Sequence, residues 1–527
     1  GLQTPSPVAL GPACAGALRP AWEGFRFSDA CGVMRPTLLQ TNGPIPMSPP
    51  GPHAMPLSRA PVRALLFTLV WLSCAWFGSW ELNPNNATRL FAALSIVEDG
   101  DATIDEFAAL TIDKASFDGH AFLDKAPGVT LMALPAVALA DWWTGETAHD
   151  QRLAWDDPLL ARFLKLRTRI AAATGAAVLT AFAAVALFEL GVAVGGTVAA
   201  GLVAALGYAL GSTAWGWSTT LFGHAPVAAL LLIATWAVHR GTAGGRAWPH
   251  AALAGAALGW ALVVEHSALL PGLPIGLLAL WRMRGWPRDR ALPAIAVALA
   301  AGTAALLPML WYNLLAFGTP FRLGYQGVVG WEGMNQGLFG LTYPRPGVLW
   351  EVLVGRYRGM LWVAPLLALG AWGLFAGRRG PARDLLLTAM AVAGVAFLYN
   401  ASYFYWDGGN ATGPRHAVPA TGFLALGLAA AWRDAGRIGR GVIAALLPVS
   451  AAINCVIAAA EITAPAGIPF ALRDAVWRGR FVTGQLRTVP DEWFGWTPFA
   501  GLWIYLAVAV PLLAALLAVA RRQHTSR

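Results

Sequence analysis

A series of apolar stretches, each close to the length of a membrane span, constrains the fold of this chain more than any other feature. An α-helix needs about 20 apolar residues to cross a bilayer. Of the 527 residues, 57% are hydrophobic and only 12% are charged, which is about half the charge of a soluble domain. We therefore predict an all-α integral membrane protein with about 12 transmembrane helices. The predicted spans are residues 64–80, 170–190, 194–211, 225–239, 250–264, 267–281, 291–311, 359–375, 385–398, 417–432, 441–460 and 501–520.

Arginine-rich turns follow every second predicted span. Examples are the runs WRMRGWPRDR (281–290), GRRGPAR (377–383) and RRQHTSR (521–527). Lys and Arg gather in cytoplasmic loops, so this order predicts cytoplasmic N- and C-termini and places the large polar loops on the outer face. The same rule accounts for the net charge of +9, so we expect no nucleic acid partner.

Two segments are assigned by their length and composition. Residues 1–61 are rich in Pro, Gly, Ala and Ser without periodicity, and we predict a disordered or non-native N-terminal extension. Residues 62–527 then form the membrane domain. The apolar stretch 129–140 is only about a dozen residues long and contains Pro135, so it fits an interfacial helix better than a span. It stays in one long external loop, residues 81–169.

That external loop carries a dense group of ionisable residues between 83 and 128. Residues 86–97 show an apolar stripe with helical spacing, which predicts an amphipathic helix along the membrane surface. Ile104, Phe107 and Leu110 continue with a second short stripe. Lys125 precedes a Pro-Gly pair in a chain that otherwise carries nearly all of its positive charge on arginine. A lysine ammonium binds phosphate as a compact point charge.

These residue types suggest sugar transfer from a lipid phosphate. Such a reaction needs a carboxylate that takes the proton from the acceptor hydroxyl and a cation beside the departing phosphate. We predict Asp113 as the base, with Asp105 as the second candidate. Lys125, Arg358 and Arg415 are the predicted donor phosphate-binding residues.

Other polar residues at the external ends of spans complete the predicted site. Arg358 precedes a span at the outer face, against the positive-inside bias. The stretch YFYWDGGNATGPRH (403–416) combines aromatic faces suited to sugar rings with glycines and Arg415. The predicted substrate-binding residues are Asp118, His120, His224, Glu265 and Trp406.

Three motifs carry a resemblance to a known family. The first loop reads N…TR…IVEDG…ID…T.DKA..DGH…DKAPG, and STTLFGH (218–224) and YFYWDGGNATGPRH follow in the same order. With the helix layout, the chain from about residue 64 resembles the polytopic GT-C glycosyltransferases, near the dolichyl-phosphate-mannose and lipid A aminoarabinose transferases of family 39 type.

The resemblance implies a specific activity and location. It implies a GT-C-like bundle in a bacterial inner (plasma) membrane, with the active site on the external face. It also implies inverting transfer of a sugar from a polyprenyl-phosphate donor to an acceptor glycan, lipid or protein. Lys125 matches the family lysine near the donor phosphate.

One departure from the family pattern leaves alternatives open. Many relatives have the catalytic Asp directly after the first span, where this chain has Asn83, Asn85 and Asn86. Asparagine cannot act as a base, so either Asp105 or Asp113 takes the role or the protein binds lipid phosphate without transfer. A transporter or flippase of a lipid-linked glycan is a further alternative, since twelve spans suit it equally. The charge concentrated in one external loop favours the enzyme.

No cofactor is assigned from the sequence. The loop acids offer oxygen ligands of the kind that Mg²⁺ or Mn²⁺ accepts, yet they show no fixed ligand spacing. We therefore assign no metal ligand.

Overall fold

The computed structural model describes residues 59–525. The chain divides into two units, residues 1–55 and 56–527, and the described residues all lie in the second. The predicted extension, residues 1–61, lies almost entirely outside the described part.

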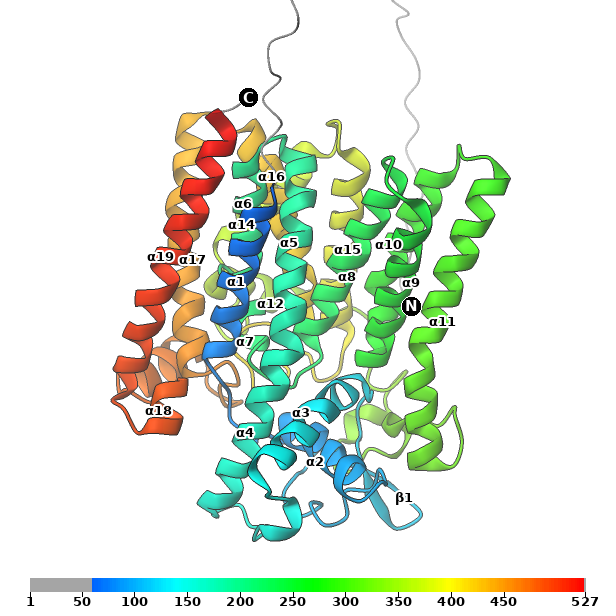
Figure 1. The fold of residues 1–527 in the computed structure, drawn as a ribbon, viewed down its shortest axis with the longest axis vertical. Coiled ribbons are helices and arrows are strands. Elements are labelled where there is room, and N and C mark those ends of the chain that lie inside the picture. The colour runs from blue at the N-terminus through cyan, green and yellow to red at the C-terminus, as the bar shows by residue number, and fades with distance from the viewer. Residues whose placement is uncertain (1–58, 526–527) are drawn as a thin grey trace, which may run out of the picture. The chain divides into compact units, whose positions relative to one another are not determined.

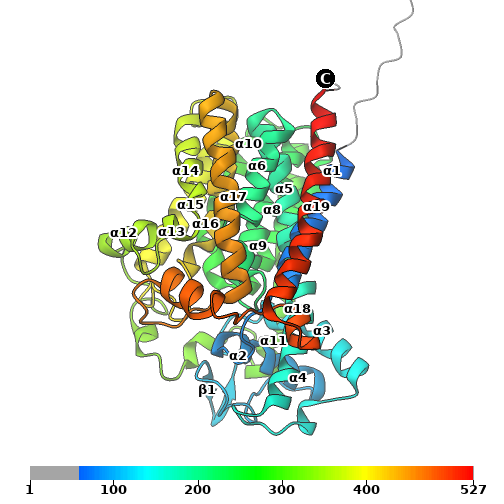
Figure 2. The ribbon, with the colours of Figure 1, turned by 90° about the vertical axis from the view of Figure 1, so that its left-hand side faces the viewer.

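Long helices that run side by side form the body of this unit (Figures 1 and 2). The apolar stretches of the sequence form these helices because a helix satisfies its own backbone hydrogen bonds. They are α1 (Ala60–Trp76), α5 (Ala176–Gly195), α6 (Val198–Ala209), α8 (His224–Thr242), α9 (Ala247–Val264), α10 (Leu269–Met283), α11 (Arg288–Phe317), α14 (Leu366–Gly377), α15 (Arg383–Ser402), α16 (Val418–Asp434), α17 (Arg437–Ala460) and α19 (Pro498–Thr525).

By length and composition, six helical stretches of the described chain are able to cross a membrane. They are residues 158–195, 247–264, 288–317, 383–402, 437–460 and 498–523. Together with the composition, they identify a membrane protein. All of the predicted spans fall mostly on helices, although three of them contain a break between two α-helices. Residues 170–190 begin in the helix Pro158–Thr174 and continue in α5, and residues 194–211 begin at the end of α5 and continue in α6. Residues 359–375 include the break at Ala364–Pro365 between α13 (Met360–Val363) and α14. The count of about 12 spans stays a prediction.

The centre of the bundle is α16, whose residues 418–430 are all buried. It packs against α5, α6, α8, α14 and α15. The contact with α14 is very close, because a Cβ on Gly427 would lie 2.0 Å from the carbonyl oxygen of Gly370. Small residues let membrane helices approach in this way.

A separate layer made from the first loop covers one end of the bundle (Figures 1 and 2). Pro84 and Pro158 open α2 and α4, and the side chains of Asn83 and Asp157 cap their free backbone N–H groups. The layer consists of α2 (Pro84–Glu98), strands β1 (Ala115–Phe117) and β2 (His120–Phe122), α3 (Gly128–Thr144) and α4 (Pro158–Thr174).

Two details of this loop differ from the prediction. Residues 85–95 of α2 are all buried, so the helix is enclosed by protein on every side and is not a half-exposed amphipathic helix on the membrane surface. Ile104, Phe107 and Leu110 are buried, as an apolar stripe requires, but their segment forms turns rather than a helix.

Shorter elements close the same end of the bundle. Three of them lie in the long connections that follow α11 and α17. They are α7 (Ala214–Trp217), α12 (Pro346–Val354), α18 (Val489–Phe494) and a π-helix at Leu472–Phe481.

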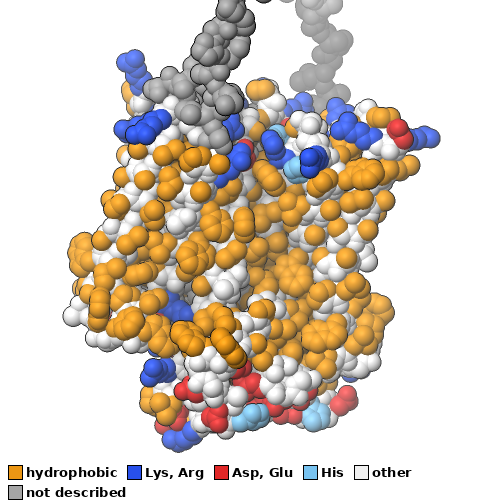
Figure 3. Space-filling view, in the orientation of Figure 1, with side chains coloured by type: hydrophobic (Ala, Val, Ile, Leu, Met, Phe, Trp, Pro, Cys, Tyr) orange, Lys and Arg blue, Asp and Glu red, His pale blue; other side chains and the backbone are white. Residues whose placement is uncertain are grey.

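Charge separates along the bundle axis. Figure 3 shows Lys and Arg gathered at one end, Asp and Glu gathered at the other with some Lys, Arg and His beside them, and a hydrophobic band between the two ends. The acidic end is the end covered by the first loop. Which end faces the cytoplasm stays a prediction from the arginine pattern.

Candidate functional site

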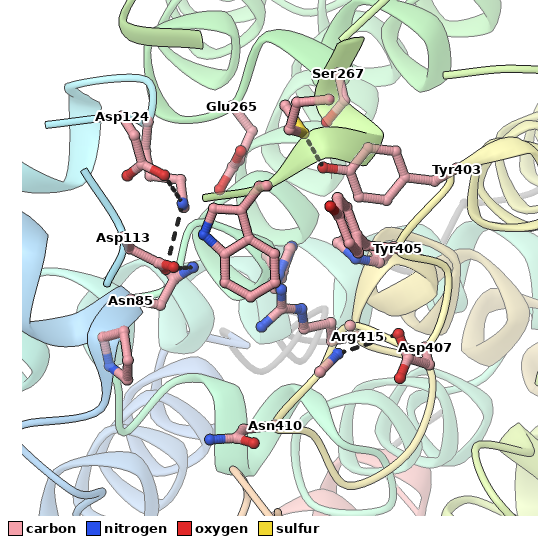
Figure 4. A pocket seen from close by; sticks show the side chains of 18 of the residues that line it. Asn85, Asp113, Asp124, Glu265, Ser267, Tyr403, Tyr405, Asp407, Asn410 and Arg415 are labelled. Atoms are coloured by element: carbon pink, nitrogen blue, oxygen red, sulfur yellow. Dashed lines mark hydrogen bonds and ion pairs between the residues drawn. The ribbon is translucent and has the colours of Figure 1, made fainter. Parts of the chain in front are cut away.

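A cavity of about 420 Å³ lies between the first loop and the ends of the helices. In Figure 4, Asp113, Asp124 and Glu265 lie on one side of it, with Tyr403, Tyr405 and Arg415 on the other. Its walls come from six segments of the chain, one of which is the stretch after α17 that contributes Ala466. The other five are the first loop with α2, the start of α8, the turn after α9, the segment between α11 and α12, and the connection from α15 to α16.

Lys125 and two carboxylates form the ionic centre of the first wall. Nζ of Lys125 lies 3.3 Å from Oδ2 of Asp113 and also contacts the carboxylate of Asp124. Burial lowers the pKa of Lys125, but the two carboxylates outweigh it and raise the pKa above its ordinary value. Burial raises the pKa of Asp124. Lys125 is therefore held as an ammonium.

Close packing explains why a glycine follows the proline after Lys125. Gly128 begins α3, and a Cβ there would lie 2.6 Å from the backbone of Val263 and Val264 at the end of α9. This close approach fixes the start of α3 against α9. It also restrains Lys125, which is separated from the helix only by Ala126 and Pro127.

Arg89 forms a second ionic centre in the same wall. Its side chain is 1% exposed, and Nη2 lies 3.0 Å from Oε1 of Glu265. Tyr325 donates to the other oxygen of Glu265 over 3.4 Å. Arg89 also donates to Asn85, whose amide in turn donates to Asp113 over 3.4 Å. A hydrogen-bonded chain thus connects the two ionic centres.

Arg415 differs from these two cations because it is unpaired. Among residues 59–525 its guanidinium has no hydrogen bond and no ion pair within 4.0 Å, and its Nε is buried without a partner. Its carbon Cζ lies 5.4 Å from the centre of the Phe222 ring. Burial lowers the pKa of Arg415, and Asp113 is the carboxylate that opposes this effect most. An unpaired guanidinium facing a cavity is suited to binding an anion.

Aromatic side chains line the opposite wall. Tyr399 and Tyr403 stack with ring centres 5.9 Å apart, and Trp331 meets Tyr405 edge to face at 5.2 Å. The Tyr405 hydroxyl accepts a hydrogen bond from the backbone of Gly333 over 3.0 Å. This bond ties the segment between α11 and α12 to the segment after α15. Flat aromatic faces beside polar groups suit the ring of a sugar.

Two histidines lie at the base of this wall. The rings of His224 and His416 are 5.2 Å apart, edge to face. Burial lowers the pKa of His416 well below its usual range, so its ring is neutral. Nε2 of His416 is buried and has no partner among the described residues. It is therefore available to a ligand in the cavity.

Five of the predicted site residues line the cavity. The first loop contributes two of them, and the ends of the helices contribute the other three. They are Asp113, Lys125, His224, Glu265 and Arg415.

Three other predicted site residues, Asp105, Asp118 and His120, lie on or beside a hairpin outside the cavity. Asp118 and Gly119 form its two-residue turn, with φ values of 53° and 89°, and Asp-Gly is a favoured pair for such a turn. Asp118 is 90% exposed. Asp105 lies beside the same hairpin, where Oδ2 is 2.6 Å from Nδ1 of the exposed His120.

The last two lie behind a wall rather than in it. Arg358 is fully buried and donates to the backbone carbonyls of Asp407 and Gly409. Trp406 accepts a hydrogen bond at its carbonyl from Asn400, and its ring lies 6.1 Å from that of Tyr357. Neither side chain lines the cavity.

Sequence reasoning did not assign several residues that line the cavity. Arg89 carried a signal, since a charged residue within an apolar helical stripe needs a buried partner. Asp124 was one acid among many in the loop, and nothing in its neighbours distinguished it. Others are aromatic or amide residues of the walls, among them Asn83, Asn85, Tyr325, Trp331, Tyr403 and Tyr405.

The described residues form no cluster of side chains suited to binding a metal ion. Within the described chain, no three His, Cys, Asp or Glu side chains come together in a way that could hold an ion. The dependence on Mg²⁺ or Mn²⁺ considered from the sequence stays untested.

Comparison with known proteins finds similar solved structures. No family model matches the chain, and no curated protein matches it. Two of these structures are ArnT from Cupriavidus metallidurans bound to undecaprenyl phosphate and the same protein in the apo state. Both are 14% identical to this chain with a TM-score of 0.48. The first match covers 88% of this chain and 75% of that one, and the second covers 89% and 76%.

Proposed function

We propose that this protein transfers a sugar from a polyprenyl-phosphate donor to an acceptor hydroxyl in this cavity, as a GT-C-type enzyme on the external face of the membrane. The observation that carries the proposal is Arg415, a buried and unpaired guanidinium across an aromatic-walled cavity from the Asp113–Lys125 ion pair. One cavity thus offers an anion site, a base and a surface for a sugar ring.

The proposed roles follow from charge. Arg415 and Lys125 bind the phosphate and stabilise the negative charge that grows on it as it departs. Asp113 takes the acceptor proton, because its carboxylate faces the cavity and lies beside the ammonium of Lys125. Lys125 is already paired with two carboxylates, so Arg415 is the cation with the greatest capacity for a new anion.

The reaction balances with these groups alone. The acceptor oxygen attacks the anomeric carbon of the sugar, and the bond from that carbon to the phosphate oxygen breaks. Its electron pair leaves with the polyprenyl phosphate, and the acceptor proton passes to Asp113. Attack from the face opposite the phosphate inverts the configuration at the sugar carbon.

The position of Asp113 bears on the missing family aspartate. Asn85 follows the first helix, where relatives carry the catalytic acid, and its amide donates to Asp113 over 3.4 Å. Asp113 therefore supplies a carboxylate next to a position at which this chain has an amide. Asp105, the other candidate base, lies beside the exposed hairpin, where it pairs with His120. These positions favour Asp113.

Native mass spectrometry with undecaprenyl phosphate tests the proposal. Wild type is compared with Lys125→Ala and Asp113→Asn. Lys114→Ala is the matched control, because Lys114 lies in the same loop but donates only to the carbonyl of Ala108. We expect wild type, Asp113→Asn and Lys114→Ala to retain the lipid and Lys125→Ala to lose most of it. Equal binding by all four proteins, or by none, would overturn the assignment and favour a transporter.

A further inference from the structure

The connection between α15 and α16 is held from behind by a buried arginine. Nε of Arg358 donates to the carbonyl of Asp407 over 2.9 Å, and Nη2 donates to the carbonyl of Gly409 over 2.6 Å. The Arg358 side chain is fully buried. One planar guanidinium thus fixes the backbone on both sides of Gly408, a geometry that a lysine ammonium cannot reproduce.

The side chain of Asp407 is held by the same group of residues. The Tyr357 hydroxyl donates to Oδ2 of Asp407 over 3.0 Å and accepts from Nη2 of Arg358 over 3.1 Å. Main chain and side chain of Asp407 therefore have separate fixed partners. The segment 407–409 forms part of the cavity wall, so that wall is rigidly supported.

Gly408 lies directly against Arg415. Its φ is +75°, and a Cβ at this position would lie 2.6 Å from Nε of Arg415. Because Arg415 has no hydrogen-bond partner among the described residues, packing against Gly408 and the ring of Phe222 determines where its guanidinium points. The position of Gly408 depends in turn on Arg358.

We propose that Arg358 is a positioning residue, which fixes Gly408 and so directs the guanidinium of Arg415 toward the phosphate of a polyprenyl-phosphate ligand. This inference rests on the proposed function. It also replaces the predicted role of Arg358, because a side chain bonded to two carbonyls behind the wall does not touch a ligand in the cavity. Arg358 acts on the phosphate through Arg415.

The test measures how well the full-length protein distinguishes undecaprenyl phosphate from undecaprenol, which lacks the phosphate. The ratio of the two bound lipids in native mass spectra reports the phosphate contact, whereas general damage to the fold lowers both signals together. The variants are Arg358→Lys, Gly408→Ala and Arg415→Ala. Gly145→Ala is the strain control, since Gly145 has a φ of +69° with nothing within 4 Å of the added Cβ.

We expect Arg358→Lys and Gly408→Ala to lower the ratio about tenfold, the effect of one charge-assisted hydrogen bond. Gly145→Ala should keep the wild-type ratio. If Arg415→Ala lowers the ratio while Arg358→Lys and Gly408→Ala keep it, Arg358 has no positioning role. If wild type binds undecaprenyl phosphate no better than undecaprenol, this result contradicts the proposed function itself and not only the role of Arg358.

Discussion

Nζ of Lys125 lies 3.3 Å from Oδ2 of Asp113, and the carboxylate of Asp124 contacts the same ammonium. One cation therefore balances two carboxylates that are both almost fully buried. Without it, the carboxylates would face one another at close range in a medium that screens charge poorly. The role of Lys125 thus extends beyond a ligand phosphate to the stability of the first loop.

Lys125→Ala is expected to destabilise the protein by about 3–5 kcal/mol, the usual cost of removing one partner from a buried ion pair. The loss is checked by thermal unfolding in detergent, compared at one detergent concentration. Lys114→Ala is the control, because Lys114 bonds only a backbone carbonyl. Equal melting temperatures of the two variants would show that Lys125 is not needed to stabilise the buried carboxylates.

Asp113→Asn should retain lipid binding and lose sugar transfer by about 10²- to 10⁴-fold, the range for a general base. Release of undecaprenyl phosphate from a panel of undecaprenyl-phosphate sugars measures the transfer. Asp105→Asn is the matched variant, because Asp105 pairs with His120 outside the cavity. A large loss in Asp105→Asn together with wild-type turnover in Asp113→Asn would exchange the two assignments.

The sequence predicted the helices well because their cause is local. Apolar stretches such as residues 441–460 must form helices in a membrane whatever surrounds them, and α17 occupies residues 437–460. The burial of α2, in contrast, has a cause that is not local in the sequence. Its apolar stripe is that of a surface helix, and only packing against α3 and α4 encloses the other face.

The same distinction applies to the candidate site. Asp113 and Lys125 were identified from their residue types within one loop. The partner of Arg89 was not predictable, because Glu265 lies in a turn far along the chain. For Arg358, by contrast, the sequence suggested a ligand contact that the structure does not support. Its place at the end of a span suggested an anion ligand, and only the fold reveals that two carbonyls already occupy its guanidinium.

Arg89→Met is expected to cost about 3–5 kcal/mol of stability, since it leaves Glu265 in the cavity wall without its cation. Glu265→Gln should cost less, because an amide oxygen still accepts from Arg89. The double variant should cost less than the sum of the two, which a double-mutant cycle of unfolding free energies measures. Arg322→Ala is the control, since its pairing with the exposed Asp118 spans 3.8 Å and such pairs contribute about 0–1 kcal/mol. Strict additivity would contradict the pairing of Arg89 with Glu265.

The Asp105–His120 pair should make the stability of the first loop depend on pH. The hydrogen bond between His120 and Asp105 raises the pKa of His120 above its ordinary value of 6.5. Burial acts to raise the pKa of Asp105, but bonds from the Ala121 N–H and His120 lower it overall below 3.8. A raised histidine pKa stabilises the fold fully below the unfolded value, and this stabilisation is lost as the pH rises through the folded value. The lowered pKa of Asp105 adds stability that is lost only as the pH falls through its folded value.

His120→Gln should therefore lower the melting temperature more at about pH 5.5 than at about pH 8.5, because only the protonated imidazole forms an ion pair with Asp105. Thermal unfolding of both proteins at the two pH values measures the difference. Ser116→Ala, on the exposed face of β1, is the control, and its difference from wild type should not change with pH, since it removes no titratable group. A gap between wild type and His120→Gln that stays constant or widens toward high pH would show that the contact is a neutral hydrogen bond.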